Sequence, residues 1–358
     1  MSVQANNIIV GMSGGIDSSV AGALLLQQGY KVTGVIMKIW AGGKLRGKGK
    51  HGCYGPEEEE DIEDARLVAQ KLGIPFRVID LAQEYREEVL DYFCHEYLEG
   101  RTPNPCVRCN LRIKFGALVE KASSLGIEYD YFATGHYARI ERDTASHRYQ
   151  LKKGRDTKKD QSYFLYNLSQ QQLAHTLFPL GGMLKSDVRK LCVQMGLGVE
   201  DKEESQNFVC GSYTSLFETQ PGPGPLMDKQ GKVLGKHRGI VNYTLGQRRG
   251  LGLAAKEPLF VTDIKPDLNA VIVGGKEDLY KTEQIISDLN WIAVDSLDET
   301  MEVRARIRSS HTGYDAVVSP LDDKRVKVNY KEPQIAAARG QAIVFYNGDV
   351  VLGGGIVI

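Results

Sequence analysis

The chain has 358 residues, of which 42% are hydrophobic, so it can bury the cores of two or three domains. Its 45 Lys and Arg residues balance 45 Asp and Glu residues, so the overall charge neither indicates nor excludes a nucleic-acid partner. No apolar run approaches the roughly 18 residues of a membrane span, and the N-terminus lacks the apolar core of a signal peptide. These absences predict a cytoplasmic protein without a membrane partner, in which the six cysteines form no disulfide framework.

A glycine-rich turn follows the first predicted strand. Residues 8–12 form an apolar run typical of a buried parallel strand, and residues 19–28 have the apolar spacing of a helix. Between them lies Ser13-Gly14-Gly15-Ile16-Asp17-Ser18. Backbone N–H groups at a helix N-terminus attract phosphate or pyrophosphate, and glycines let it approach closely. The turn is neither a Walker loop nor a dinucleotide fingerprint, because it lacks both Gly-Lys-Ser/Thr and G-x-G-x-x-G.

The next segments alternate between strand and helix patterns. Residues 31–37 read as a second parallel strand, whose end at Met37 should line the same crevice as the glycine-rich turn. Residues 40–56 are rich in Gly, Lys and His without periodicity, which predicts a mobile basic loop that is a lid, a nucleic-acid contact, or neither of these. A helix over 57–72, a strand over 76–79 and a helix over 84–97 follow. This alternation predicts the α/β class, with a doubly wound parallel sheet.

Two cysteines follow a proline-rich stretch at residues 101–110, Arg-Thr-Pro-Asn-Pro-Cys-Val-Arg-Cys-Asn. The prolines predict an extended segment leading into a helix that starts near Ile113. Cys106 and Cys109 stand at C-x-x-C spacing beside Arg108 and Arg112, which predicts a lowered thiol pKa. Half a zinc site, a redox dithiol, cluster or sulfur chemistry, and two incidental cysteines are all compatible with this spacing.

Further candidate site residues come later in the chain. Residues 132–137 read as a short strand ending in Gly135 and His136, where the histidine is either a satisfied loop residue or faces the crevice. Residues 158–165 join a basic turn to an aromatic run, which suits contact with phosphate and base. After a helix over 184–195, Cys210 is either a buried strand cysteine or a third thiol beside the C-x-x-C pair.

The alternating Pro and Gly residues at 221–225 predict a domain boundary, because this pattern excludes both helix and central strand. We expect a catalytic domain over 1–218, a small β-rich domain over 219–283 and a C-terminal β-barrel over 284–358. The central domain should hold short strands over 231–234, 239–245, 259–264 and 270–273. The barrel should hold five, over 301–308, 315–319, 325–330, 341–346 and 350–354.

The ordered set of motifs resembles the tRNA-specific 2-thiouridylases, which belong to the ATP pyrophosphatases. The motifs are GMSGGIDSS, TPNPCVRCN-x-x-IKF, ATGHYAR, KDQSYFLY, YTLGQRRGLG and GQAIVFYNG, and they run essentially from Ile8 to Gly354. The resemblance implies that ATP adenylates the 2-carbonyl oxygen of the wobble uridine in tRNA and that sulfur then displaces AMP. It also implies a sulfur-carrier protein or a cysteine desulfurase as a second partner, with a monomer favoured.

The resemblance assigns roles to individual residues. Cys210 would carry a persulfide, and Cys109 would attack it or close a disulfide with it. Asp17 would lie near Mg²⁺ and the phosphates. The ATP-binding positions are Gly11, Met12, Ser13, Gly14, Gly15, Ile16, Asp17, Ser18, Met37 and Gly135. The positions that would hold the target base or contact tRNA are Asn104, Pro105, Cys106, His136, Lys159, Asp160, Gln161, Arg308 and Gln341.

Two departures from the family pattern leave the sulfur chemistry open. Cys106 stands where better-known members have Asp, and Cys210 lies five residues after Ser205 instead of four. Cys106, Cys109 and Cys210 could ligate a 4Fe-4S cluster with one open iron, or could serve a persulfide relay. Zinc is less favoured, because a fourth ligand is not visible. Another adenylating enzyme that forms a C–N bond, or a non-catalytic tRNA-binding protein, are the alternative functions.

Overall fold

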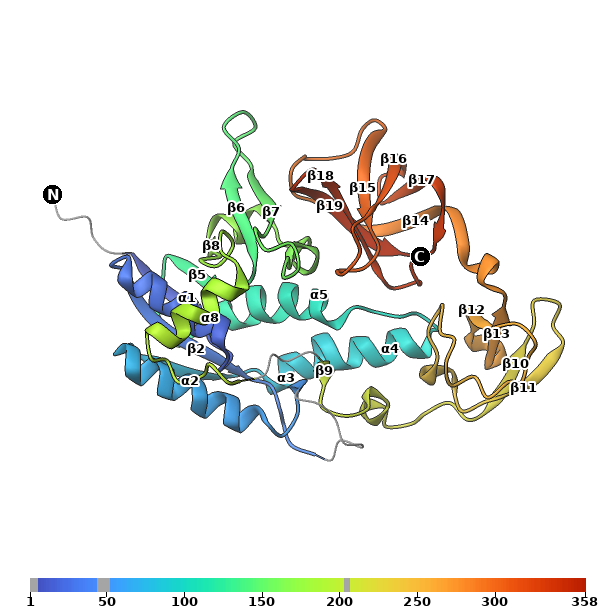
Figure 1. Ribbon diagram of the computed structural model, residues 1–358, viewed down its shortest axis with the longest axis horizontal. Coiled ribbons are helices and arrows are strands. Elements are labelled where there is room, and N and C mark those ends of the chain that lie inside the picture. Colours follow the sequence, from blue (N-terminus) through green and yellow to red (C-terminus); the bar gives the residue numbers. More distant parts are fainter. Residues whose placement is uncertain (1–5, 44–51, 203–206) are drawn as a thin grey trace. The chain divides into compact units, whose positions relative to one another are not determined.

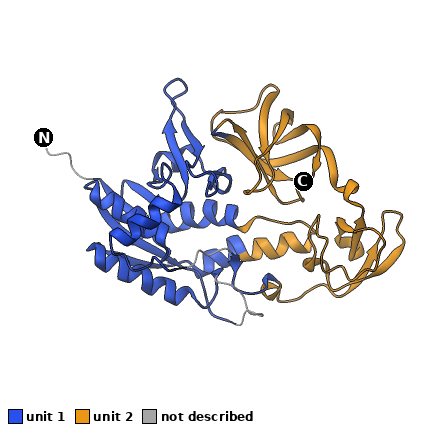
Figure 2. Cartoon of the chain, viewed as in Figure 1, with its two compact units in different colours: residues 1–89, 106–213, 349–351 blue, residues 90–105, 214–348, 352–358 orange. Residues whose placement is uncertain are grey.

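The computed structural model describes residues 6–43, 52–202 and 207–358. The chain forms two compact units, coloured separately in Figure 2. Unit 1 comprises Met1–Val89, Cys106–Tyr213 and Asp349–Val351, and unit 2 comprises Leu90–Pro105, Thr214–Gly348 and Leu352–Ile358. Among the described helices, none combines the length and apolar character that crossing a membrane requires.

A five-stranded parallel sheet forms the centre of unit 1 (Figure 1). Its strand order is β4-β2-β1-β5-β8. The strands are β1 (Asn7–Gly11), β2 (Lys31–Lys38), β4 (Phe76–Asp80), β5 (Tyr131–Thr134) and β8 (Thr176–Leu177). Ile8, Ile9 and Val10 are all buried, as expected for a central strand covered on both faces. The predicted parallel sheet of an α/β fold is therefore confirmed.

Three helices cover one face of this sheet: the largely buried α1 (Ile16–Gln27) and the amphipathic α2 (Glu58–Leu72) and α8 (Lys185–Gln194). Val20, Val68 and Val188, one from each helix, belong to the same apolar cluster as Ile8 and Val10. Helix α2 ends at Gly73, whose φ of 66° is a left-handed cap conformation that glycine adopts without strain. The apolar spacing thus predicted these helices correctly.

The thiol-bearing segment differs from the prediction. Helix α5 (Pro105–Cys109) begins at the second proline and runs through the π-helical segment η2 (Asn110–Ala117) into α6 (Leu118–Ser124). The expectation of an extended segment up to Ile113 was wrong, because proline is well tolerated in the first turn of a helix, where its missing N–H would have no helical partner. Upstream, α3 (Ala82–Tyr85), π-helical η1 (Arg86–Asp91) and α4 (Tyr92–Leu98) also form one run.

A short ladder lies within the predicted basic loop. Strand β3 (Gly52–Tyr54) pairs in parallel with β9 (Asn207–Val209), so residues 52–54 are not part of an irregular loop. Residues 44–51 lie outside the described residues. The remaining elements of unit 1 are β6 (Ala138–Arg142), β7 (Tyr149–Lys153), η3 (Ser162–Leu165) and α7 (Gln170–Ala174). Val350 and Val351 pair with β7, which explains why they belong to unit 1.

Unit 2 contains a four-stranded sheet of order β11-β10-β13-β12. Its strands are β10 (Gly224–Met227), β11 (Val233–His237), β12 (Phe260–Lys265) and β13 (Ala270–Gly274). Pro225 lies within the central strand β10, contrary to the prediction that the Pro-Gly run excludes one. The parallel pairing with β13 begins only at Leu226, and Pro225 is paired only with Lys236 of β11.

Residues 239–245 form the short helix η5 (Ile240–Asn242) instead of a strand. The other short helices are η4 (Tyr213–Leu216), η6 (Pro266–Leu268) and η7 (Lys276–Leu279).

An antiparallel barrel completes unit 2. It comprises β14 (Tyr280–Trp291), β15 (Met301–Arg306), β16 (Tyr314–Asp322), β17 (Arg325–Ile335), β18 (Ala342–Asn347) and β19 (Val350–Val357). The sequence predicted five of these strands and missed β14. This strand pairs with both β17 and β19, and so closes the barrel around the apolar cluster of Ile286, Val303, Val318 and Phe345.

Candidate active site

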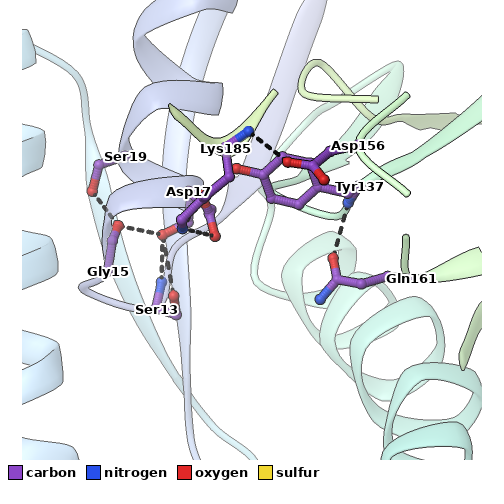
Figure 3. Close-up of polar contacts among 9 residues, drawn as sticks. Ser13, Gly15, Asp17, Ser19, Tyr137, Asp156, Gln161 and Lys185 are labelled. Carbon is purple, nitrogen blue, oxygen red and sulfur yellow. Dashed lines mark hydrogen bonds and ion pairs between the residues drawn. The ribbon is translucent and has the colours of Figure 1, made fainter. Parts of the chain in front are cut away.

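The glycine-rich turn joins β1 to the N-terminus of α1, as predicted (Figure 3). The Ser18 hydroxyl accepts a hydrogen bond from the Ser13 N–H at 3.1 Å and donates to the Gly15 carbonyl at 3.2 Å. Gly14 has a φ of 68°, and a Cβ there would lie 2.5 Å from the Asp61 carbonyl oxygen. The turn is therefore held in one conformation that requires glycine, with its N–H groups at a helix N-terminus.

Asp17 lies at the first turn of α1 and accepts hydrogen bonds from two residues distant in sequence (Figure 3). Lys185 Nζ lies 2.7 Å from both carboxylate oxygens, and the Tyr137 hydroxyl donates to Oδ1 at 2.7 Å. The backbone N–H of Lys185 also donates to Asp156 at 3.0 Å. The sequence analysis missed Lys185 and Tyr137, because no local pattern indicates that α8 begins beside α1.

The loop after β5 closes over the same turn. A Cβ at Gly135 would lie 2.7 Å from the Asp17 carbonyl carbon and 2.8 Å from the Ser18 nitrogen, so the two loops touch through their backbones. Met37 is half-buried near the carboxyl end of β2, beside Ile79 of β4. The predicted ATP-binding residues thus gather at the carboxyl ends of neighbouring strands, where open α/β sheets bind ligands.

Cys106 and Cys109 lie on α5, with thiols that favour the protonated form. Desolvation raises the pKa of Cys106 to about 11 and that of Cys109 to about 12. Cys106 is exposed at the surface, whereas Cys109 is half-buried. The predicted lowering of the thiol pKa was wrong. The Arg108 guanidinium is engaged by Glu88 at 2.6 Å, and the cation that does act on both thiols, Lys114, is outweighed by desolvation.

Cys53 is a third thiol in the same surroundings, and the sequence analysis did not select it. It lies on β3, and its negative charge when ionised contributes to the raised pKa of both Cys106 and Cys109. The neighbouring Tyr54 stacks on Tyr85 with ring centroids 5.6 Å apart. The pairing of β3 with the distant β9, which no short-range pattern predicts, determines this position.

Cys210 follows β9 directly and is buried. Its N–H donates to the Tyr54 carbonyl at 3.0 Å, and its thiol donates to Glu57 Oε1 at 3.1 Å. This hydrogen bond is the main reason that the pKa of Cys210 is raised, followed by desolvation. Glu57 Oε2 is buried without a hydrogen-bond partner, an unusual state for a carboxylate oxygen. Glu57 is therefore a further site residue that the sequence analysis missed.

The arrangement of thiols does not fit a three-cysteine metal cluster. Across residues 6–43, 52–202 and 207–358, no three His, Cys, Asp or Glu side chains come together as a metal site. The thiol of Cys210 donates its hydrogen bond to Glu57. Cys106, Cys109 and Cys210 as placed therefore do not supply the predicted ligand set.

Several predicted tRNA-contacting side chains hold their own loops in place. Gln161 accepts the Tyr137 N–H at 2.9 Å, and Asp160 accepts the Gly154 and Ser162 N–H groups at 3.2 and 3.1 Å. His136 Nδ1 lies 2.7 Å from the Thr134 hydroxyl, and desolvation lowers the pKa of this histidine well below its ordinary value. Lys159 is half-buried in the same loop, whereas Arg308 is exposed on unit 2.

The segment that precedes the thiol helix is part of unit 2. Asn104 and Pro105 are half-buried at its end, directly before Cys106. Gln341 Nε2 donates to the Thr102 carbonyl at 2.6 Å and lies 3.4 Å from the Pro103 carbonyl. Gln341 is therefore already in contact with the segment that bears two of the predicted base-binding residues.

Comparison with known proteins covers nearly the whole chain. The family model described as a tRNA methyl transferase HUP domain matches residues 6–211. A tRNA methyl transferase PRC-barrel domain matches 216–275, and an aminomethyltransferase beta-barrel domain matches 281–357. A Clostridium perfringens protein named tRNA-specific 2-thiouridylase MnmA is 47% identical over 98% of both chains. A Clostridium botulinum protein of the same name is 46% identical over 100% of this chain and 99% of its own.

Solved structures show weaker similarity. A 4-thiouridine synthetase in complex with RNA and ATP is 16% identical, with a TM-score of 0.34 over 59% of this chain and 48% of its own. The NMN synthetase of Francisella tularensis is 17% identical, with a TM-score of 0.33 over 60% of this chain and 69% of its own.

Proposed function

The chain belongs to the family of tRNA-specific 2-thiouridylases, and we propose that it adenylates the 2-carbonyl oxygen of the wobble uridine with ATP and then replaces that oxygen with sulfur. The observation that carries this proposal is the glycine-rich turn at the start of α1, with Asp17 and Lys185 beside it, in the same unit as Cys109 and Cys210. ATP-dependent tRNA uridine 2-thiolation is the function of the family. The substrate of this family is tRNA.

The ATP phosphates would bind at the N–H groups of residues 13–18 and at the Lys185 ammonium group. Asp17 is 30% exposed and carries a free negative charge when Lys185 turns to a phosphate, so its oxygens fit a Mg²⁺ ion. When bound, Mg²⁺ would neutralise charge on the phosphates. Gly11, Met12, Met37 and Gly135 would form the walls around the nucleotide.

Adenylation turns the 2-carbonyl oxygen into a good leaving group. The oxygen attacks the α-phosphorus of ATP, the bond from the α-phosphate to pyrophosphate breaks, and pyrophosphate leaves. Asn104, Pro105 and Cys106 would hold the uridine, while His136, Lys159, Asp160, Gln161 and Arg308 would shape or contact the tRNA surface. His136 is neutral at pH 7 because its pKa is lowered, so it would act by hydrogen bonding and not as a cation.

We favour a persulfide relay over a cluster, because the relay requires only Cys109 and Cys210 to meet during turnover, whereas a cluster requires three thiolates held together, and the described residues hold no such group. Cys210 would carry a persulfide delivered by a sulfur-carrier protein or a cysteine desulfurase. The terminal sulfur attacks C2 and displaces AMP. The Cys109 thiolate then attacks the Cys210 sulfur, which releases the C2 thiocarbonyl and leaves a Cys109–Cys210 disulfide. An external dithiol must reduce this disulfide before the next turnover.

The proposal is tested by mass spectrometry of nucleosides from tRNA incubated with the protein, ATP and a persulfide donor. Wild-type protein should form 2-thiouridine, AMP and pyrophosphate. Cys210→Ser should release pyrophosphate but form neither AMP nor 2-thiouridine, because no sulfur displaces AMP. Cys109→Ser should form AMP but no 2-thiouridine, whereas Asp17→Asn should release no pyrophosphate. Cys94→Ser, which alters a half-buried thiol of α4, is the matched control and should retain activity.

Two results would contradict the scheme. Persistent thiolation in the Cys109→Ser/Cys210→Ser double variant would favour an adenylating enzyme of another kind. Iron and sulfide bound stoichiometrically after anaerobic purification, and lost in Cys106→Ser, would replace the relay with a cluster. A monomer in the cytoplasm is the proposed state of the protein.

A further inference from the structure

The turn before β18 holds the segment that leads to the thiol helix. Thr102 donates its N–H to the Arg339 carbonyl at 2.7 Å, while Gln341 Nε2 donates to the Thr102 carbonyl at 2.6 Å. The side-chain amide of Gln341 and the backbone carbonyl of Arg339, two residues earlier, thus bind both polar groups of the Thr102 backbone. All of these residues belong to unit 2.

The approach of these two backbones depends on Gly340. Its φ is 85°, and a Cβ there would lie 3.1 Å from both Arg101 Cβ and the Thr102 nitrogen. The turn is also tied to its own barrel, because Gly340 N–H donates to Val357 and Val357 N–H donates to Gln341, both at 2.9 Å. The backbone of Gln341 is therefore hydrogen-bonded to the barrel, and the end of its side chain is hydrogen-bonded to Thr102.

A second contact holds the same segment from the side of α4. Arg101 donates through Nε and Nη2 to the two carboxylate oxygens of Glu96 at 2.8 and 2.6 Å, a bidentate pair. The Arg101 N–H also donates to the Glu96 carbonyl at 2.8 Å. Residues 101–103 are therefore held between α4 and the barrel turn, and Pro103 is buried.

We infer that Gln341 is a positioning residue, which fixes the extended segment 101–103 and thereby sets where Asn104, Pro105 and the start of the thiol helix lie. Only Asn104 separates Pro103 from the first residue of α5, so little chain is available to absorb a displacement. This inference rests on the proposed function for the identity of the base-binding residues. It differs from the role that the family resemblance implied, in which Gln341 contacts tRNA directly.

The first experiment is hydrogen–deuterium exchange of the full chain without ATP or tRNA. In Gln341→Glu the side chain keeps its size but presents a carboxylate to the Thr102 carbonyl, so the segment should loosen. We expect amide exchange in peptides covering 101–105 to become about tenfold faster, the loss of one net hydrogen bond. Gln230→Glu, the same change at an exposed turn of unit 2, should leave this exchange unchanged.

Gln341→Lys keeps a donor at the end of a flexible side chain and should restore exchange to near the wild-type rate. If exchange over 101–105 is the same in wild type and Gln341→Glu, the inference is overturned. It is also overturned if exchange rises equally in β18, because the variant would then have loosened the barrel as a whole. This arm is independent of thiolation, so it decides the inference even if the proposed function fails.

Steady-state kinetics separate positioning from direct tRNA contact. Positioning predicts that Gln341→Glu lowers kcat for thiolation about tenfold, with KM for tRNA changed less than about twofold, and that Gln341→Lys recovers kcat. A direct contact predicts a raised KM for tRNA, an unchanged kcat and unchanged exchange over 101–105. That second pattern would overturn the inference.

Discussion

Asp17 and Lys185 form the most buried ion pair of the candidate site, with side-chain exposures of 30% and 9%. Such a pair contributes little net stability when it is complete, because desolvation offsets attraction. Removing one partner is costly, since the other charge remains without compensation. The pair therefore adds little to the stability of the fold, and under the proposed function its two groups would instead serve phosphate and Mg²⁺.

Lys185→Met should lower the free energy of unfolding. Loss of a partner in a fully buried pair costs about 3–5 kcal/mol, and because Asp17 is partly exposed we expect about 1–3 kcal/mol here. Adding Asp17→Asn should recover part of this loss, because the two changes share one interaction. Urea denaturation of the single and double variants measures both effects, and simple additivity would contradict the pairing.

Glu57 should suppress the reactivity of Cys210. Glu57→Gln removes the negative charge that raises the pKa of this thiol, so the thiolate fraction near neutral pH should increase, about tenfold for each unit by which the pKa falls. Iodoacetamide labelling at pH 7.5, followed by peptide mass spectrometry, measures it. Glu59→Gln, an exposed position on the same helix, is the control. Equal labelling of Cys210 in both variants would count against the contact.

The thiols of Cys106 and Cys109 should be slow to alkylate in the folded protein. With pKa values raised to about 11 and about 12, both are protonated near neutrality, and the thiolate forms only as the pH rises. The labelling rate should therefore increase about tenfold per pH unit between pH 7 and 9.5, without a plateau. In urea, the labelling rate of the same peptides should stop rising near pH 8.5. If the labelling rate in the folded chain reaches a plateau below pH 8, the thiol pKa is lowered, as the sequence predicted, and this prediction is wrong.

Among the elements, those with a continuous pattern were predictable and those that depend on distant pairing were not. Strands β1 and β2 and helices α2 and α8 follow from apolar spacing alone. The sequence analysis missed strand β14 because its alternating pattern is interrupted at Asp288, whose φ is 48°. The register of β14 also shifts against both of its partner strands. Strand β3 has three residues and exists because β9 pairs with it.

The loops after β1 and β5 touch at Gly135, and we expect that this position accepts no residue larger than glycine. Gly135→Ala would place a Cβ 2.7 Å from the Asp17 backbone, so the start of α1 must shift. We expect ATP affinity to fall at least about tenfold, because the N–H groups that would hold phosphate move with that helix. Gly182→Ala, where the new Cβ would meet no atom within 4 Å, should bind ATP normally. Isothermal titration calorimetry compares them, and equal affinities would refute the argument.

At the scale of the whole molecule, the sequence predicted the class of the fold and the position of the glycine-rich turn between strand and helix, but not the surroundings of the thiols. The turn is a contiguous motif whose chemistry depends on neighbouring residues. The pKa of Cys106 and that of Cys109 depend instead on desolvation by the surrounding chain, and that of Cys210 depends on Glu57, which lies on another segment. The spacing of residues along the chain does not show how strongly a thiol is desolvated. The sequence therefore predicted a lowered thiol pKa, whereas in the structure the pKa is raised.

The closure of the barrel by β14 has a consequence for how the protein behaves in concentrated solution. An open sheet presents a row of backbone donors and acceptors onto which a strand of another molecule can add, and this is a common route to aggregation. Because β14 pairs with β17 on one side and β19 on the other, the described barrel strands offer no such template between them. The strand that the sequence analysis missed is thus the one that removes the free edges of the barrel.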